Sequence, residues 1–173
     1  MVVKTLGAIA IAANVVGTLV VIGLVAVLNY DVVARGAFSA PFLGAVEIVQ
    51  FSMVLIVFLQ LPDVVRTGRL TRSDGFLLVV GSGHPRMENV MRRIADLISA
   101  VLMALITVAT WPEFLDAWES GDYFGVPGVF TAPWWPVKGT IVFSAALCTL
   151  LFAAKVIQGP TAGISDVPRD ESL

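Results

Sequence analysis

Four long apolar runs constrain the fold of this chain more than any other feature of its sequence. They cover residues 6–28, 43–61, 94–111 and 134–157, and they are rich in Leu, Val, Ile and Ala. At about 1.5 Å per residue, a helix of this length crosses the ~30 Å hydrocarbon layer of a membrane with modest tilt. A helix also satisfies its own backbone hydrogen bonds, which lipid cannot do. The runs therefore predict an all-α, polytopic membrane protein with four transmembrane helices.

The composition agrees with this class. Of the 173 residues, 57% are hydrophobic and only 14% are charged, and the mean hydropathy is +0.88, well above that of a soluble domain. A transmembrane barrel would need alternating segments of about ten residues, whereas these runs are continuous. The first run exceeds the roughly 7–15 apolar residues of a signal peptide, and a cleavage site before Pro41 would be a poor one, so we expect a retained helix. We predict one membrane domain over residues 1–158, with helices at about 6–28, 43–61, 86–111 and 134–157, and a flexible cytoplasmic tail over residues 159–173.

The basic residues predict an orientation. Only Arg35 and Lys138 flank the apolar runs on one side of the membrane, and the connection between the third and fourth runs on that side is acidic. The other nine are Lys4, Arg66, Arg69, Arg72, Arg86, Arg92, Arg93, Lys155 and Arg169. Because cytoplasmic loops carry an excess of Lys and Arg, both termini and the long basic loop are expected in the cytoplasm.

Polar residues at the outer ends of the helices predict an ion pair. Glu47 stands about one turn below the outer surface, and Gln50 lies one turn deeper on nearly the same face. An ionised carboxylate in lipid costs several kcal/mol unless it is paired, so Glu47 should face a protein partner. Lys138 enters the fourth helix at a similar depth and is the predicted partner, with Arg35 as the competing one.

The first run contains one amide about midway along its length. Asn14 is expected to bond to a neighbouring helix, a role that we favour over one in a ligand pathway. Ala13 and Gly17 are small residues four positions apart, a spacing that suits close packing of helices.

Several connecting segments are predicted to lie at the membrane surface. Residues 34–42 mix Gly, Phe, Ser and Pro and are expected to form a short interfacial segment before the second helix, which should end at Pro62. After it come Arg66, Arg69 and Arg72, which we expect to meet anionic headgroups at about 1 kcal/mol each, in preference to forming a substrate gate.

Beyond the third run, acidic residues at every third position would form a patch if the segment is helical: Glu113, Asp116, Glu119 and Asp122. This patch either receives a basic partner protein or stays solvated.

The sequence lacks the residues that most catalytic, haem-binding and metal-binding sites require. Its one cysteine, Cys148, excludes an internal disulfide, and its one histidine, His84, excludes bis-histidine haem ligation and argues against a zinc site. A net charge of −2 gives no nucleic-acid footprint, and no catalytic motif is present. We therefore expect no enzyme, no cofactor and no metal, and a subunit that packs against and positions other proteins. The alternative is a self-sufficient homo-oligomeric channel or small transporter, for which Asn14 alone is thin support.

Three short motifs carry a family resemblance. The segments "RGAFSAP", "GAVE" and, after the second run, "RTGRLTRSD" resemble the small permease subunit of tripartite ATP-independent periplasmic (TRAP) transporters. The residues at matching places are Arg35, Phe38, Ser39, Pro41, Glu47, Arg66, Gly68 and Leu70. The chain departs from the family pattern at four places. Gly36 stands where the family usually has an aromatic residue, Gly44 where a Trp is frequent and Arg69 where a His is usual. The acidic residue Asp74 lies one position later than the family's acidic residue.

The resemblance implies a non-catalytic scaffold in the bacterial inner membrane. Such a subunit stands beside a large multi-helix permease, which carries the sodium and substrate sites and moves as an elevator. A periplasmic solute-binding protein delivers organic acids such as dicarboxylates from outside. Residues 35–47 would then form an interfacial brace, and the acidic patch would contribute to docking of the binding protein.

Overall fold

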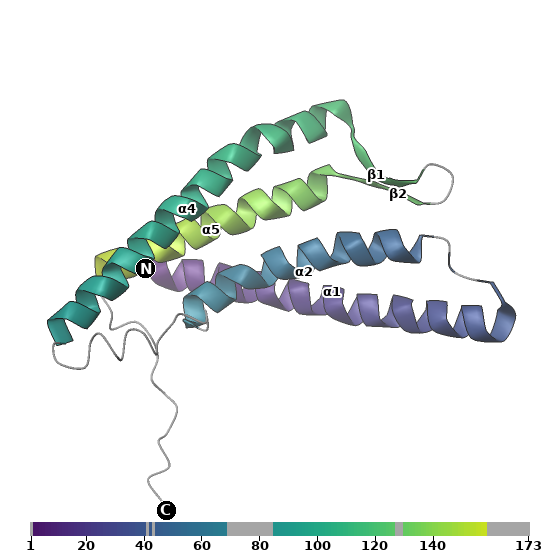
Figure 1. Cartoon of the computed structure of the whole chain (residues 1–173), viewed down its shortest axis with the longest axis horizontal. Helices are drawn as coiled ribbons and strands as arrows, with labels where there is room; N and C mark the ends of the chain where they lie inside the picture. Colours follow the sequence, from purple (N-terminus) through teal and green to yellow (C-terminus); the bar gives the residue numbers. More distant parts are fainter. Residues whose placement is uncertain (1, 41, 43, 69–84, 127–129, 159–173) are drawn as a thin grey trace, which may run out of the picture.

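Over the residues that the structure describes, the protein forms four long helices and one short β-hairpin (Figure 1). The computed structural model describes residues 2–40, 42, 44–68, 85–126 and 130–158. In chain order the elements are α1 (Val2–Phe38), α2 (Ala45–Thr67), α4 (Pro85–Ser120), β1 (Tyr123–Val126), β2 (Phe130–Pro133) and α5 (Trp135–Gln158). All four helices are long and apolar enough to cross a membrane, which confirms the predicted fold class. The predicted tail over residues 159–173 lies outside the described residues.

α1 extends well beyond the first apolar run. Its 37 residues correspond to about 55 Å of helix, so it tilts or passes beyond the hydrocarbon layer. The predicted end of the first helix at about residue 28 is wrong, because the chain leaves the helix only at Ser39, which has a φ of 51°. The polar residues remain helical because they find partners one turn back: the Asn29 amide donates to the Val25 carbonyl at 2.7 Å, and Arg35 pairs with Asp31.

α2 also passes its predicted end. Pro62 is fully buried inside the helix, which continues to Thr67. A proline removes one helical hydrogen bond, but membrane helices tolerate it where neighbouring helices pack around the site. The helix ends at Gly68, whose left-handed conformation (φ 69°) lets its N–H approach the carbonyls of Val64 and Val65.

α4 continues through Pro112 to Ser120, so the acidic segment after the third run is indeed mostly helical. A feature that the sequence does not predict follows it. β1 and β2 pair antiparallel, with Tyr123 opposite Pro133 and Val126 opposite Phe130. The Trp134 N–H donates to the Asp122 carbonyl at 2.9 Å, which closes the base of this hairpin at the start of α5.

The helices form a layer that is open at one end. α2 packs between α1 and α5, and α5 packs between α2 and α4. The packed core joins Ala10 near the start of α1, Val65 near the end of α2 and Phe152 near the end of α5, and Ala100 from the middle of α4 packs against it. Away from this core, the α1–α2 and α4–α5 hairpins diverge (Figure 1). The start of α1 and the end of α5 therefore lie at the same, closed end of the layer.

Candidate functional site

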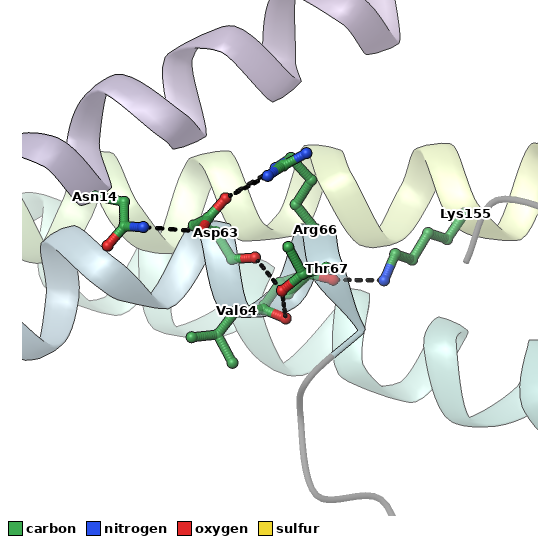
Figure 2. Close-up of polar contacts among 7 residues, drawn as sticks. Asn14, Asp63, Val64, Arg66, Thr67 and Lys155 are labelled. Carbon is green, nitrogen blue, oxygen red and sulfur yellow. Dashed lines mark hydrogen bonds and ion pairs between the residues drawn. The ribbon is translucent and has the colours of Figure 1, made fainter. Parts of the chain in front are cut away.

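A polar network lies beside the apolar core at the closed end of the layer. The Asp63 carboxylate of α2 accepts a hydrogen bond from the Asn14 amide of α1 at 2.9 Å (Figure 2). Its other oxygen pairs with the Arg66 guanidinium at 2.8 Å. Asn14 thus bonds to a neighbouring helix, as expected from its position in the first run. The carboxylate in turn is compensated by an amide and a cation, the arrangement that a partly buried charge requires.

A lysine from the α4–α5 hairpin adds a further polar contact at the end of α2. The Lys155 ammonium, in the last turn of α5, donates to the Val65 carbonyl in the last turn of α2 (Figure 2). The Val65 carbonyl also accepts from the Gly68 N–H, and a cation at this helix C-terminus interacts favourably with the helix dipole. We call Asn14, Asp63, Val65, Arg66 and Lys155 the hairpin joint, because their contacts link α1 to α2 and α2 to α5.

A second set of contacts fixes the turn between α1 and α2. The buried Asp31 carboxylate accepts a hydrogen bond from the Phe42 N–H at 2.8 Å and from the Arg35 guanidinium at 2.9 Å. Tyr30 packs edge-on against Phe42, with ring centroids 6.3 Å apart. Asp31 and Phe42 therefore brace the turn between α1 and α2. Arg35 pairs with Asp31 and not with Glu47, its competing predicted partner.

The predicted Glu47–Lys138 ion pair is wrong. Lys138 bonds instead to Glu113 of α4, at 3.1 Å. The reason is the shape of the layer: α4 packs along α5, whereas the start of α2, at the open end of the layer, diverges from α5 (Figure 1). A similar predicted depth is not enough to pair two residues, because their helices must also be neighbours at that level.

The remaining predicted residues are placed as follows. Gln50 is exposed on α2. Arg66 is held by Asp63 in the hairpin joint, whereas Arg69 and Arg72, the other two predicted lipid contacts, lie outside the described residues. Asp116, Glu119 and Asp122 are exposed at the end of α4 and just beyond it, close to an aromatic cluster in which Trp118 and Trp135 have ring centroids 4.9 Å apart.

The two aspartates that organise the polar contacts were missing from the predicted site residues. The sequence does contain a local pattern that identifies them: Asp31 stands four residues before Arg35, and Asp63 stands three residues before Arg66. On a helix these spacings bring opposite charges together. What the spacing does not reveal is that each aspartate also holds a second segment, through Phe42 and Asn14 respectively.

The arrangement of these side chains holds helices together. Within the described ranges, no group of three or more His, Cys, Asp or Glu side chains is placed to bind a metal ion. The polar groups of the joint bond to one another across helices, which suits a subunit that keeps a fixed shape.

Comparison with known protein families decides the class. A profile of tripartite ATP-independent periplasmic transporters, DctQ component, matches residues 24–161, which is most of the chain. This chain belongs to the DctQ family. DctQ proteins are a transporter component family and not an enzyme family, and with its four membrane-length helices this DctQ protein is a multi-pass protein of the inner membrane. No curated protein and no solved structure matches it significantly.

Proposed function

We propose that this DctQ chain is the stationary scaffold of a sodium-coupled importer of organic acids. The supporting observation is the hairpin joint, in which Asn14 of α1 bonds to Asp63 of α2 and Lys155 of α5 bonds to the Val65 carbonyl of α2, while Arg66 pairs with Asp63 within α2. A scaffold needs such fixed contacts, whereas a transport pathway needs polar groups that are available to a solute. The large permease subunit carries the sodium and substrate sites in this proposal, and a periplasmic solute-binding protein supplies the ligand.

The orientation belongs to the same proposal. With both termini in the cytoplasm, the hairpin joint lies at the cytoplasmic side and the β-hairpin lies outside. The exposed acidic residues at the end of α4 then face the periplasm, where they would contribute to docking of the binding protein.

Reconstitution of purified components tests the scaffold role. The DctQ chain alone, and the complex with its large permease subunit, are placed in liposomes, and uptake of a labelled organic acid is measured with a sodium gradient and the binding protein present. We expect no uptake by the DctQ chain alone and sodium-dependent uptake by the complex. Uptake by the DctQ chain alone would support the homo-oligomeric channel instead.

A further inference from the structure

One face of α2 is not covered by the other described helices, and its exposed residues are spaced as in a helix that packs along another helix. The exposed residues in its outer half are Val46, Gln50, Met53 and Val57, which we call the α2 seam. Their separations of four, three and four residues match the repeat by which one helix packs along another. The exposed fractions of Val46, Met53 and Val57 are 63%, 58% and 59%, so neither α1 nor α5 covers this face. Apolar exposure alone would fit lipid equally well, so the polar member of the seam decides what covers it.

Gln50 differs from Thr18 and Asn29, two exposed polar residues of α1. The Thr18 hydroxyl donates to the Asn14 carbonyl at 2.9 Å, and the Asn29 amide donates to the Val25 carbonyl at 2.7 Å, so both bond to their own helix. By contrast, the described residues provide no hydrogen bond to the Gln50 side-chain amide. An amide without a partner in hydrocarbon costs free energy, which a hydrogen bond from another helix recovers.

Glu47 adds a charge at the same edge of α2. It is half-buried, one turn before Gln50, and no described residue forms an ion pair with it because Lys138 and Arg35 are engaged elsewhere. A carboxylate near the membrane surface on a packing face favours a basic side chain opposite it. The same charge disfavours a second copy of the chain, since a two-fold axis along the membrane normal would bring Glu47 against Glu47.

We infer that the α2 seam receives a transmembrane helix of the large permease subunit, which presents a hydrogen-bonding side chain opposite Gln50 and a basic side chain opposite Glu47. This inference rests on the proposed scaffold role and adds the face by which the scaffold is attached. The exposed apolar faces of α1 and α4 are then left to lipid.

Site-specific photo-crosslinking tests this assignment. A photoreactive amino acid replaces Met53 or Val57 in the seam, and, as matched controls, Ile22 of α1 or Val108 of α4, which are similarly exposed at 60% and 71%. Each variant is co-expressed with the large subunit, and the complex is isolated before irradiation. We expect a covalent product with the large subunit from the two seam positions, at several times the yield from the controls. Products with lipid only, products with a second DctQ chain only, or yields no higher than the controls would overturn the inference.

Because the complex is isolated first, this test separates the two proposals. Failure to co-purify with any large subunit contradicts the scaffold role, whereas co-purification without seam crosslinks contradicts only the seam.

A second measurement addresses the amide directly. Gln50→Leu should increase the loss of large subunit during detergent washing by roughly three- to tenfold, the range expected from one hydrogen bond between membrane helices. Thr18→Val is the control, since Thr18 bonds only to its own helix, and it should leave retention unchanged. Equal retention for both variants would contradict a hydrogen-bonded partner at Gln50.

Discussion

At the scale of single residues, Asp63 organises the polar contacts of the hairpin joint. Its two carboxylate oxygens serve different helices: one accepts from Asn14 of α1 and the other pairs with Arg66 of its own helix. The Asp63 and Arg66 side chains are 17% and 31% exposed, so the ion pair is partly screened and its contribution is smaller than that of a fully buried pair. The contact to Asn14 is the one that connects two helices.

A double-mutant cycle on Asn14 and Asp63 measures that connection. We expect Asn14→Ala and Asp63→Ala each to lower the free energy of unfolding, with a coupling energy of about 0.5–1.5 kcal/mol between them, because the second change cannot break a bond already lost. Asp63→Asn should retain part of the coupling, since its side-chain oxygen still accepts from the Asn14 amide. Thermal unfolding in detergent provides the measurement, and additive effects of the two alanine changes would contradict the contact.

At the scale of helices, close approach between α1 and α2 depends on one glycine. A Cβ at Gly17 would lie 2.9 Å from the Gln60 Cγ and 3.2 Å from the Leu59 Cβ, both too close. The small-residue spacing of Ala13 and Gly17 thus serves packing within the hairpin, as the sequence predicts. The corresponding approach of α5 to α4 occurs at Gly139, where a Cβ would lie 3.0 Å from the Phe114 ring.

Two glycines of α1 provide a matched comparison. Gly17→Ala should destabilise the protein by about 1–3 kcal/mol, the usual cost of overpacking a close contact. Gly23→Ala should be neutral or stabilise by up to about 1 kcal/mol, because nothing lies within 4 Å of its Cβ and alanine favours the helix. Melting temperatures of the two variants in the same detergent test this, and equal values would contradict the observed packing.

At the scale of the whole molecule, the two ends of the open layer carry different groups of residues. The closed end contains the apolar core and the hairpin joint, and the open end carries the aromatic cluster, the β-hairpin and the exposed acids. Glu113 is paired with Lys138, which leaves Asp116, Glu119 and Asp122 as the acids that the proposed docking surface would use.

Charge reversal at the open end tests the docking proposal. Asp116→Lys combined with Glu119→Lys should slow association with the binding protein by at least about tenfold at low salt, and the difference should shrink as salt rises, because exposed charges act mainly on association rates and are screened. Asp116→Asn with Glu119→Gln should give an intermediate effect. Surface plasmon resonance on the isolated complex gives the rates, and association that is insensitive to both pairs of changes would contradict the proposal.

The sequence by itself determined the class of fold and the family. Four apolar runs are sufficient for four spans, because lipid leaves a buried backbone few alternatives to the helix. The motifs around Arg35 and Glu47 led to the family that the profile match shows, and Asn14 was recognisable as a helix-to-helix contact from its place in an apolar run. Helix ends were less predictable, because Asp31 and Pro62 act through contacts formed only in the folded chain.

The tertiary structure alone decided which residues meet. The sequence predicts a similar depth for Glu47 and Lys138, yet the two hairpins diverge and Lys138 pairs with Glu113. Sequence position along a membrane helix fixes depth, since each residue rises about 1.5 Å, but it leaves lateral order open. That order, α1–α2–α5–α4, follows from the close approach at Gly17 and Gly139 and from Lys155 at the end of α2.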